Sequence, residues 1–124
     1  MKTKANVLVV SGYGLNCEEE TLRAFTQVGC KGDIIHLNDL IETPGILKHY
    51  NILAFPGGFS YGDDTGSGRA YGNKIKNNLK KEILAFVKRD TLVLGICNGF
   101  QILTQIGLLP GTLLHNEQAR YIDR

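Results

Sequence analysis

The segment TLVLGICNGFQILTQIG, residues 91–107, decides the fold of this chain. Its first part, Leu-Val-Leu at 92–94, is a short apolar run, which is typical of a buried parallel strand. Phe100, Leu103 and Gly107 then recur at helical spacing. The segment therefore predicts a strand that runs directly into a helix, with the pattern Gly-x-Cys-x-Gly in the turn between them.

Cys97 stands at the centre of that turn. The pattern is the thiol counterpart of the Gly-x-Ser-x-Gly turn that exposes a nucleophilic serine. A thiol at a helix N-terminus meets unpaired backbone N–H groups and the positive end of the helix dipole, which both favour the thiolate. The alternative is a small, inert cysteine buried at a tight turn. The flanking glycines and the strand before them favour the nucleophile.

The rest of the chain alternates apolar runs with amphipathic segments, which predicts a parallel sheet with right-handed crossovers. Val7–Val10 is apolar throughout and is expected to be a central strand. Asn16 is the expected N-cap of the first helix, with Gly29 at its end. Cys17 also stands at this helix start, but it lacks the preceding Gly-x and the strand-to-helix turn of Cys97, so it is expected to be structural. The expected strands are residues 5–11, 33–37, 52–55 and 92–94, and a long helix is expected over residues 73–89.

A second glycine-rich turn follows the third expected strand. Gly57 and Gly58 stand at its carboxyl end, where open α/β sheets place their sites. A backbone N–H there can face the Cys97 turn and serve as an oxyanion donor opposite that of Asn98. The polar stretch over residues 60–72 is expected to be a long mobile loop. It lacks the spacing of a Walker phosphate loop.

Bulk properties exclude several classes of protein. The 124 residues suffice for one domain, residues 1–124, with a real core. A net charge of +2 does not indicate nucleic-acid binding. Three cysteines at unrelated spacings argue against a disulfide framework or a metal site and favour the reducing cytoplasm. No apolar run is long enough for a membrane span. The acidic residues 18–20 are better explained as a helix start than as metal ligands.

Three motifs together resemble those of a known family. GICNGFQ at 95–101 resembles the nucleophile motif of the class I, triad-type glutamine amidotransferases. PGGFSYGD at 56–63 and GLNCE at 14–18 are similar to the oxyanion loop and the first loop of the glutaminase subunits of phosphoribosylformylglycinamidine synthase. The resemblance covers essentially the whole chain. The sequence departs from the usual family pattern after Asp63, where the loop is unusually rich in glycine.

The resemblance implies a flavodoxin-like open parallel sheet with helices on both faces. It also implies that Cys97 forms a thioester with glutamine and releases glutamate and ammonia for formylglycinamidine ribonucleotide synthesis, a step of purine biosynthesis. The implied partner is a synthetase, which would use ATP and Mg²⁺, while this chain itself would need no cofactor. The residues implied to hold the oxyanion or line the glutamine site are Gly57, Gly58, Phe59, Ser60, Asn98 and Gln101.

The general base is the point at which the family pattern fails to transfer. In the family, a His-x-Glu motif near the end of the domain supplies it. His115-Asn116-Glu117 has these letters but follows the Cys97 helix too soon, and His36 and His49 match no motif. His36 is expected to make a structural hydrogen bond. The expectation is therefore a C-terminally incomplete amidotransferase domain with negligible turnover by itself.

Two other functions stay open at this point. The chain could be a non-catalytic module that binds glutamine or a partner. It could also belong to another α/β family with a cysteine at a similar turn, although Gln101 and the Gly-Gly-Phe-Ser segment count against that.

Overall fold

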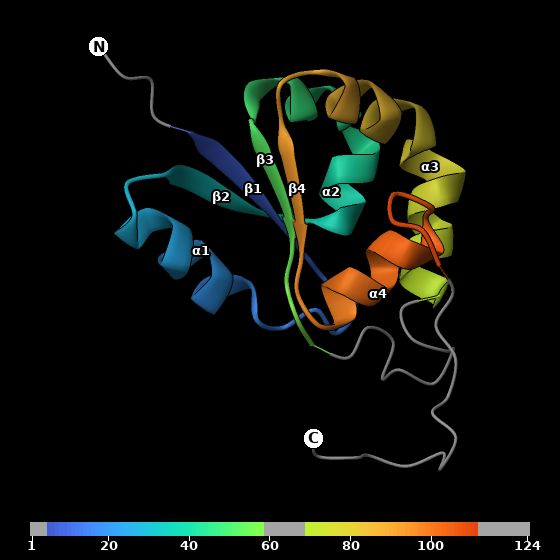
Figure 1. The fold of residues 1–124 in the computed structure, drawn as a ribbon, viewed down its shortest axis with the longest axis horizontal. Coiled ribbons are helices and arrows are strands. Elements are labelled where there is room, and N and C mark those ends of the chain that lie inside the picture. Colours follow the sequence, from blue (N-terminus) through green and yellow to red (C-terminus); the bar gives the residue numbers. More distant parts are fainter. Residues whose placement is uncertain (1–4, 59–68, 112–124) are drawn as a thin grey trace.

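Four parallel strands form one open sheet in the order β2-β1-β3-β4 (Figure 1). The structure is a computed structural model, which describes residues 5–58 and 69–111. Among these, no helix has both the length and the apolar character needed to cross a bilayer. The elements are β1 (Asn6–Ser11), α1 (Glu18–Gln27), β2 (Lys31–His36), α2 (Leu37–Glu42), the 3-10 helix η1 (Pro44–His49), β3 (Ile52–Phe55), α3 (Arg69–Lys88), β4 (Leu92–Gly95) and α4 (Asn98–Gln105).

The strand β1 is central, as its apolar sequence predicts. It pairs with β2 on one side and with β3 on the other, and Val7–Val10 has no solvent-exposed surface. The chain moves outward from β1 to β2 and then returns to build β3 and β4 on the other side. The direction of winding therefore reverses between β1 and β3, which is where doubly wound sheets hold their ligands.

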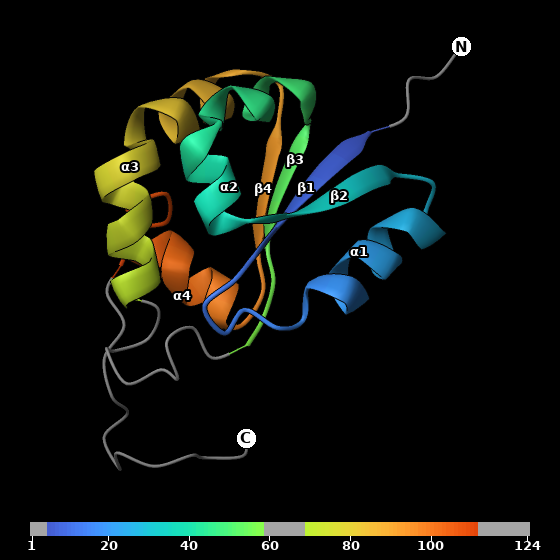
Figure 2. The same cartoon turned by 180° about the vertical axis from the view of Figure 1, so that it is seen from behind.

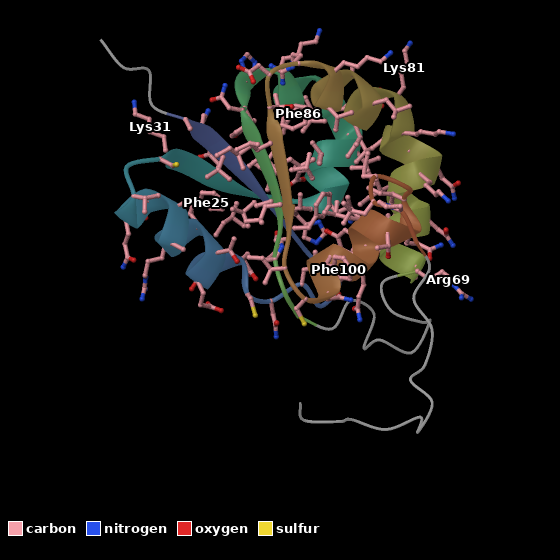
Figure 3. The ribbon with its side chains drawn as sticks, viewed as in Figure 1. Phe25, Lys31, Arg69, Lys81, Phe86 and Phe100 are labelled. Atoms are coloured by element: carbon pink, nitrogen blue, oxygen red, sulfur yellow. The ribbon has the colours of Figure 1, made fainter. Side chains whose placement is uncertain are left out.

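Helices cover both faces of the sheet, as Figure 2 shows from behind. Leu8, Leu53 and Phe55 point to the face on which α2, η1, α3 and α4 pack. Val7 and Ala54 point to the other face, where Leu22 and Phe25 of α1 meet them. Phe25 and Phe86 accordingly lie on opposite sides of the sheet in Figure 3. The predicted α/β, flavodoxin-like architecture is confirmed.

The prediction of a buried strand before Cys97 is wrong for the described residues. Leu92 is 67% exposed and Leu94 is 40% exposed, whereas Val93 packs against the core beside α3 and α4. The reason is the position of the strand: among residues 5–58 and 69–111, β4 pairs with β3 alone, and α1 lies over β1 and β2. Burial of an apolar strand depends on what covers each face, which the local sequence does not state.

The long helix begins earlier than its apolar periodicity predicts. α3 starts at Arg69 rather than at residue 73, so residues 69–72 are not part of a loop. Tyr71 is fully buried, and its hydroxyl donates a hydrogen bond to the carbonyl oxygen of Ser11 at 2.9 Å. This contact with β1 fixes the first turn of α3. Residues 60–68, the remainder of the expected mobile loop, lie outside the described residues.

The first helix also starts one residue later than predicted. Its N-cap is Cys17, which makes no side-chain cap bond, and not Asn16. Asn16 instead lies against Gly58 of the neighbouring turn. The acidic residues 18–20 do occupy the first turn of α1, as predicted.

Candidate active site

Three turns meet at the carboxyl edge of the sheet, which is the lower edge in Figure 1. They follow β1, β3 and β4. The backbone N–H of Ile96 donates to the carbonyl oxygen of Phe55 at 3.0 Å, which joins the second and third turns. The N–H of Cys17 donates to the carbonyl oxygen of Gly57 at 3.2 Å, which joins the first and second. The three motifs of the sequence therefore form one site.

Cys97 occupies the sharp turn that the sequence predicts. It is the N-cap of α4, its side chain is exposed, and its backbone has φ +54° and ψ −112°. Positive φ is rare for residues other than glycine and stores about 1–3 kcal/mol of strain. Such a backbone holds the thiol away from the strand and at the start of the helix. This is the geometry of a turn that presents a nucleophile.

The glycines around Cys97 are required by close packing. A Cβ on Gly99 would overlap the backbone carbonyl oxygen of Phe55. A Cβ on Gly95 would stand 2.6 Å from a methyl group of Leu103 and 2.8 Å from the carbonyl oxygen of Gly99. The turn is therefore pressed against β3 and against the first turns of α4. This packing explains the spacing of the Gly-x-Cys-x-Gly pattern.

Gly57 lies against Cys97, and Gly58 follows it in the same turn. A Cβ on Gly57 would lie 3.5 Å from the Cβ of Cys97, an ordinary contact distance. Gly58 has φ +142°, and a Cβ there would overlap the carbonyl oxygen of Gly14 and stand 2.8 Å from the backbone nitrogen of Asn16. The turn after β1 thus supports the turn after β3 from behind.

Asn98 and Gln101 lie in the first turn of α4. The Asn98 side chain is 1% exposed, and its amide donates to the side-chain carbonyl oxygen of Gln101 at 2.7 Å. This bond holds the two side chains in a fixed relation next to Cys97. Residues Phe59 and Ser60, also predicted to line the site, lie outside the described residues.

Cys17 is a member of the site that the sequence interpretation treated as merely structural. Its sulfur would lie 4.0 Å from a Cβ on Gly57, the same position that the Cβ of Cys97 approaches to 3.5 Å. Burial raises the pKa of the Cys17 thiol, and the carboxylate of Glu20 raises it further. A signal was present: Cys17 follows a central strand, and the carboxyl ends of neighbouring parallel strands share one edge.

Neither described histidine can reach Cys97. His36 ends β2, three strand positions from β4, which is about 14 Å across the sheet. As predicted, its role is structural, because its Nδ1 accepts the backbone N–H of Asn38 at 3.0 Å. His49 ends η1 before β3, at the opposite end of the strands. His115 lies outside the described residues. Residues 5–58 and 69–111 also contain no cluster of three or more metal-ligating side chains.

Comparison with known proteins gives a consistent result. The family model described as "CobB/CobQ-like glutamine amidotransferase domain" matches residues 4–124. Phosphoribosylformylglycinamidine synthase subunit PurQ of Methanococcus maripaludis is 55% identical over 114 residues, which cover 90% of this chain and 42% of that protein. The PurQ subunit of Dehalococcoides mccartyi is 39% identical over 127 residues, covering 96% of this chain and 50% of the relative.

A solved structure is similar as well. The structure of PurLQS from Thermotoga maritima matches with a TM-score of 0.75 and 32% identity, over 97% of this chain and 52% of the matched chain. The chain therefore spans about half the length of the relatives that it matches.

Proposed function

The chain belongs to the CobB/CobQ-like glutamine amidotransferase domain family, and we propose that it carries the nucleophile half of a glutaminase site that supplies ammonia to phosphoribosylformylglycinamidine synthase. The observation that carries this proposal is the backbone of Cys97, a positive-φ residue exposed between a parallel strand and a helix. A purely structural cysteine would have no need of this strained and exposed position.

The reaction begins when the Cys97 thiolate attacks the side-chain carboxamide carbon of glutamine. A tetrahedral intermediate forms, its oxygen carries the negative charge, and ammonia leaves after the amide nitrogen is protonated. The thioester on Cys97 is then hydrolysed by water to glutamate. The start of α4 favours the thiolate and the oxyanion through its dipole and its N–H groups.

We assign the oxyanion donors to the backbone N–H groups of Gly58 and Asn98. Supporting this, Gly57 lies within contact distance of Cys97, Gly58 follows it in the same turn, and Asn98 follows Cys97 at the first position of α4. Such donors are effective because they are held in place before the reaction begins. The turn after β1, packed behind Gly58, provides this support. Phe59, Ser60 and Gln101 are proposed to contact the glutamine.

The acceptor of the ammonia is proposed to be a synthetase, as the names of the relatives suggest. PurQ is named as a subunit of phosphoribosylformylglycinamidine synthase, and the matched structure is titled as a PurLQS assembly. We assign the use of ATP and Mg²⁺ to that partner and not to this chain.

A glutamine analogue that carries a chloromethyl ketone in place of its carboxamide tests the proposal. We expect the analogue to alkylate Cys97 at least ~10-fold faster than Cys30, because only Cys97 combines a nucleophile turn with a substrate site. Added glutamine should slow this labelling and added asparagine should not. Peptide mass spectrometry against time measures both effects, and Cys97→Ser is the control.

Equal labelling of the three cysteines, in a chain shown to be folded by circular dichroism, would contradict the proposal. It would leave the non-catalytic binding module as the better interpretation. His36→Ala and His49→Ala should leave the labelling of Cys97 unchanged, because His36 lies three strand positions away and His49 lies at the opposite end of the strands.

A further inference from the structure

Two cysteines lie against the same glycine of the site. A Cβ on Gly57 would lie 3.5 Å from the Cβ of Cys97 and 4.0 Å from the sulfur of Cys17. Cys17 is also tied to this glycine by its backbone N–H. Cys30, by contrast, precedes β2 at the opposite end of the strands. The fold therefore brings together two of the three cysteines, which are separated by 79 intervening residues in the sequence.

The two thiols differ in environment. Cys97 is exposed, and Cys17 is partly covered. Burial is the first cause that raises the pKa of Cys17, followed by the charge of Glu20, while the nearby Cys97 contributes in the same direction. An oxidant in solution therefore meets Cys97 first, and Cys17 stays protonated beside it.

We propose that Cys17 and Cys97 form a hydroperoxide-responsive pair, in which Cys97 is oxidised first and Cys17 then closes a disulfide with it. This builds on the proposed function only in that Cys97 is the reactive thiol. The pair makes the nucleophile subject to reversible oxidation, and its co-reactant is a hydroperoxide such as hydrogen peroxide.

The chemistry takes two steps. In the first, the Cys97 thiolate attacks a peroxide oxygen: a sulfur–oxygen bond forms, the oxygen–oxygen bond breaks, and the alkoxide or hydroxide that leaves takes up a proton. In the second, the sulfur of Cys17 attacks the sulfenic acid on Cys97, the disulfide forms, and the hydroxyl group leaves with the Cys17 proton as water. Two thiols are oxidised, and one hydroperoxide is reduced to an alcohol and water, or to two waters.

Closure requires the two sulfurs to approach to about 2.05 Å with their Cα atoms within about 7 Å. The exposed Cys97 side chain can rotate towards Gly57. The Cys17 thiol donates a weak hydrogen bond to Oδ1 of Asn16, with 3.7 Å between the two atoms. A bond of this length does not prevent the side chain from rotating.

Closing the disulfide both inactivates Cys97 and protects its sulfur from further oxidation. While the disulfide is closed, the sulfur of Cys97 cannot attack glutamine. It is also shielded from further oxidation to the sulfinic acid, which thiols do not reverse. Reduction by a dithiol would return both thiols.

The experiment compares the chain with its Cys17→Ser and Cys30→Ser variants. Each is treated with a small excess of hydrogen peroxide, then divided and incubated with or without dithiothreitol. Peptide mass spectrometry follows the bonds, and the labelling of Cys97 by iodoacetamide follows its recovery. For the chain and for Cys30→Ser we expect a Cys17–Cys97 disulfide, two hydrogens lighter than the thiols, with at least ~10-fold more labelling after the dithiol than before.

In Cys17→Ser the sulfenic acid should persist long enough to be trapped by dimedone and should then proceed to the sulfinic acid, so that the dithiol restores little labelling. Two results would overturn the proposal. One is direct oxidation of Cys97 to the sulfinic acid with Cys17 still free. The other is a disulfide that involves Cys30 as often as Cys17. Either result would leave the glutamine-analogue labelling of the reduced chain untouched, so the two proposals fail separately.

Discussion

Two turns of this molecule place a cysteine at the N-cap of a helix, and they differ in almost everything else. Cys17 follows β1 after a five-residue connection and has φ −96°, whereas Cys97 follows β4 after Ile96 alone and has φ +54°. Three carboxylates fill the first turn of α1, and the first turn of α4 has none. Neither cysteine makes a side-chain cap bond.

A position at a helix N-terminus is therefore not sufficient to make a cysteine a nucleophile. The short connection at Cys97 forces the strained backbone and exposes the thiol, while the long connection at Cys17 allows a relaxed backbone and partial burial. At the start of α1 the helix dipole stabilises the carboxylates of residues 18–20, and their negative charge disfavours a thiolate at Cys17. Connection length and first-turn charge thus separate a reactive thiol from a supporting one.

The largest expected effect comes from a side chain at Gly99. Gly99→Ala would drive its Cβ into the backbone carbonyl of Phe55, which cannot rotate away. We expect a loss of about 3 kcal/mol in the free energy of unfolding, measured by urea denaturation. Gly45→Ala is the matched control, because no atom of the described part of the chain lies within 4 Å of a Cβ there. Equal stability of the two variants would show that the Cys97 turn is looser than described.

The next effect reports the backbone strain itself. Replacing each cysteine by glycine and by alanine removes the thiol in both cases and changes only the backbone preference. The advantage of glycine over alanine should be greater at Cys97 than at Cys17 by about 1 kcal/mol, because only Cys97 has positive φ. N-cap preferences are common to both positions and cancel in this difference. The free energies of unfolding of the four variants measure this. Equal glycine–alanine differences at the two positions would show that the backbone of Cys97 is not strained.

A smaller effect tests the acidic first turn. The negative charge of Glu20 disfavours the Cys17 thiolate and so raises the pKa of that thiol, after the larger contribution of burial. Glu20→Gln should therefore lower this pKa, increase the thiolate fraction at pH 8, and make alkylation of Cys17 faster. The pH dependence of iodoacetamide labelling measures the change. Glu19→Gln is the control and should not produce the change, because Glu19 is not among the groups that raise the pKa of Cys17.

The smallest effect concerns Tyr13, the other residue with φ +54°, in the turn that carries Cys17. Lys74 donates to its hydroxyl at 2.9 Å and lowers the pKa of the phenol, with a further contribution from Asn38. Tyr50 behaves oppositely, because burial and Asp33 raise its pKa to about 12. Carbon NMR of labelled tyrosines should show Tyr13 ionising well before Tyr50. Lys74→Met should move only Tyr13, to higher pH.

Much of the fold could be predicted from local sequence. The apolar runs at Val7–Val10 and Ile52–Phe55 become buried parallel strands because a run apolar on both faces is stable only between two layers of helices. The Gly-x-Cys-x-Gly pattern also became the strained turn that it predicts. In each of these cases the cause lies within a few residues of its effect.

Other features depended on neighbours far away in the sequence. The exposure of Leu92 and Leu94 follows from the lack of a helix over that part of the sheet in the described residues, and the early start of α3 follows from the bond between Tyr71 and Ser11. The position of Cys17 beside Cys97 also depends on contacts between segments that are far apart in the sequence.

Local sequence was sufficient to predict the succession of strands and helices along the chain, the central place of β1 and Cys97 as the candidate nucleophile. Hydrophobic periodicity and turn chemistry are local properties, so each of these predictions depends on a few neighbouring residues. Only the tertiary structure decided which thiol stands next to it and which apolar strand stays exposed. Parallel pairing in the order β2-β1-β3-β4 brings the turns after β1, β3 and β4 to one edge, and no local pattern contains that distance.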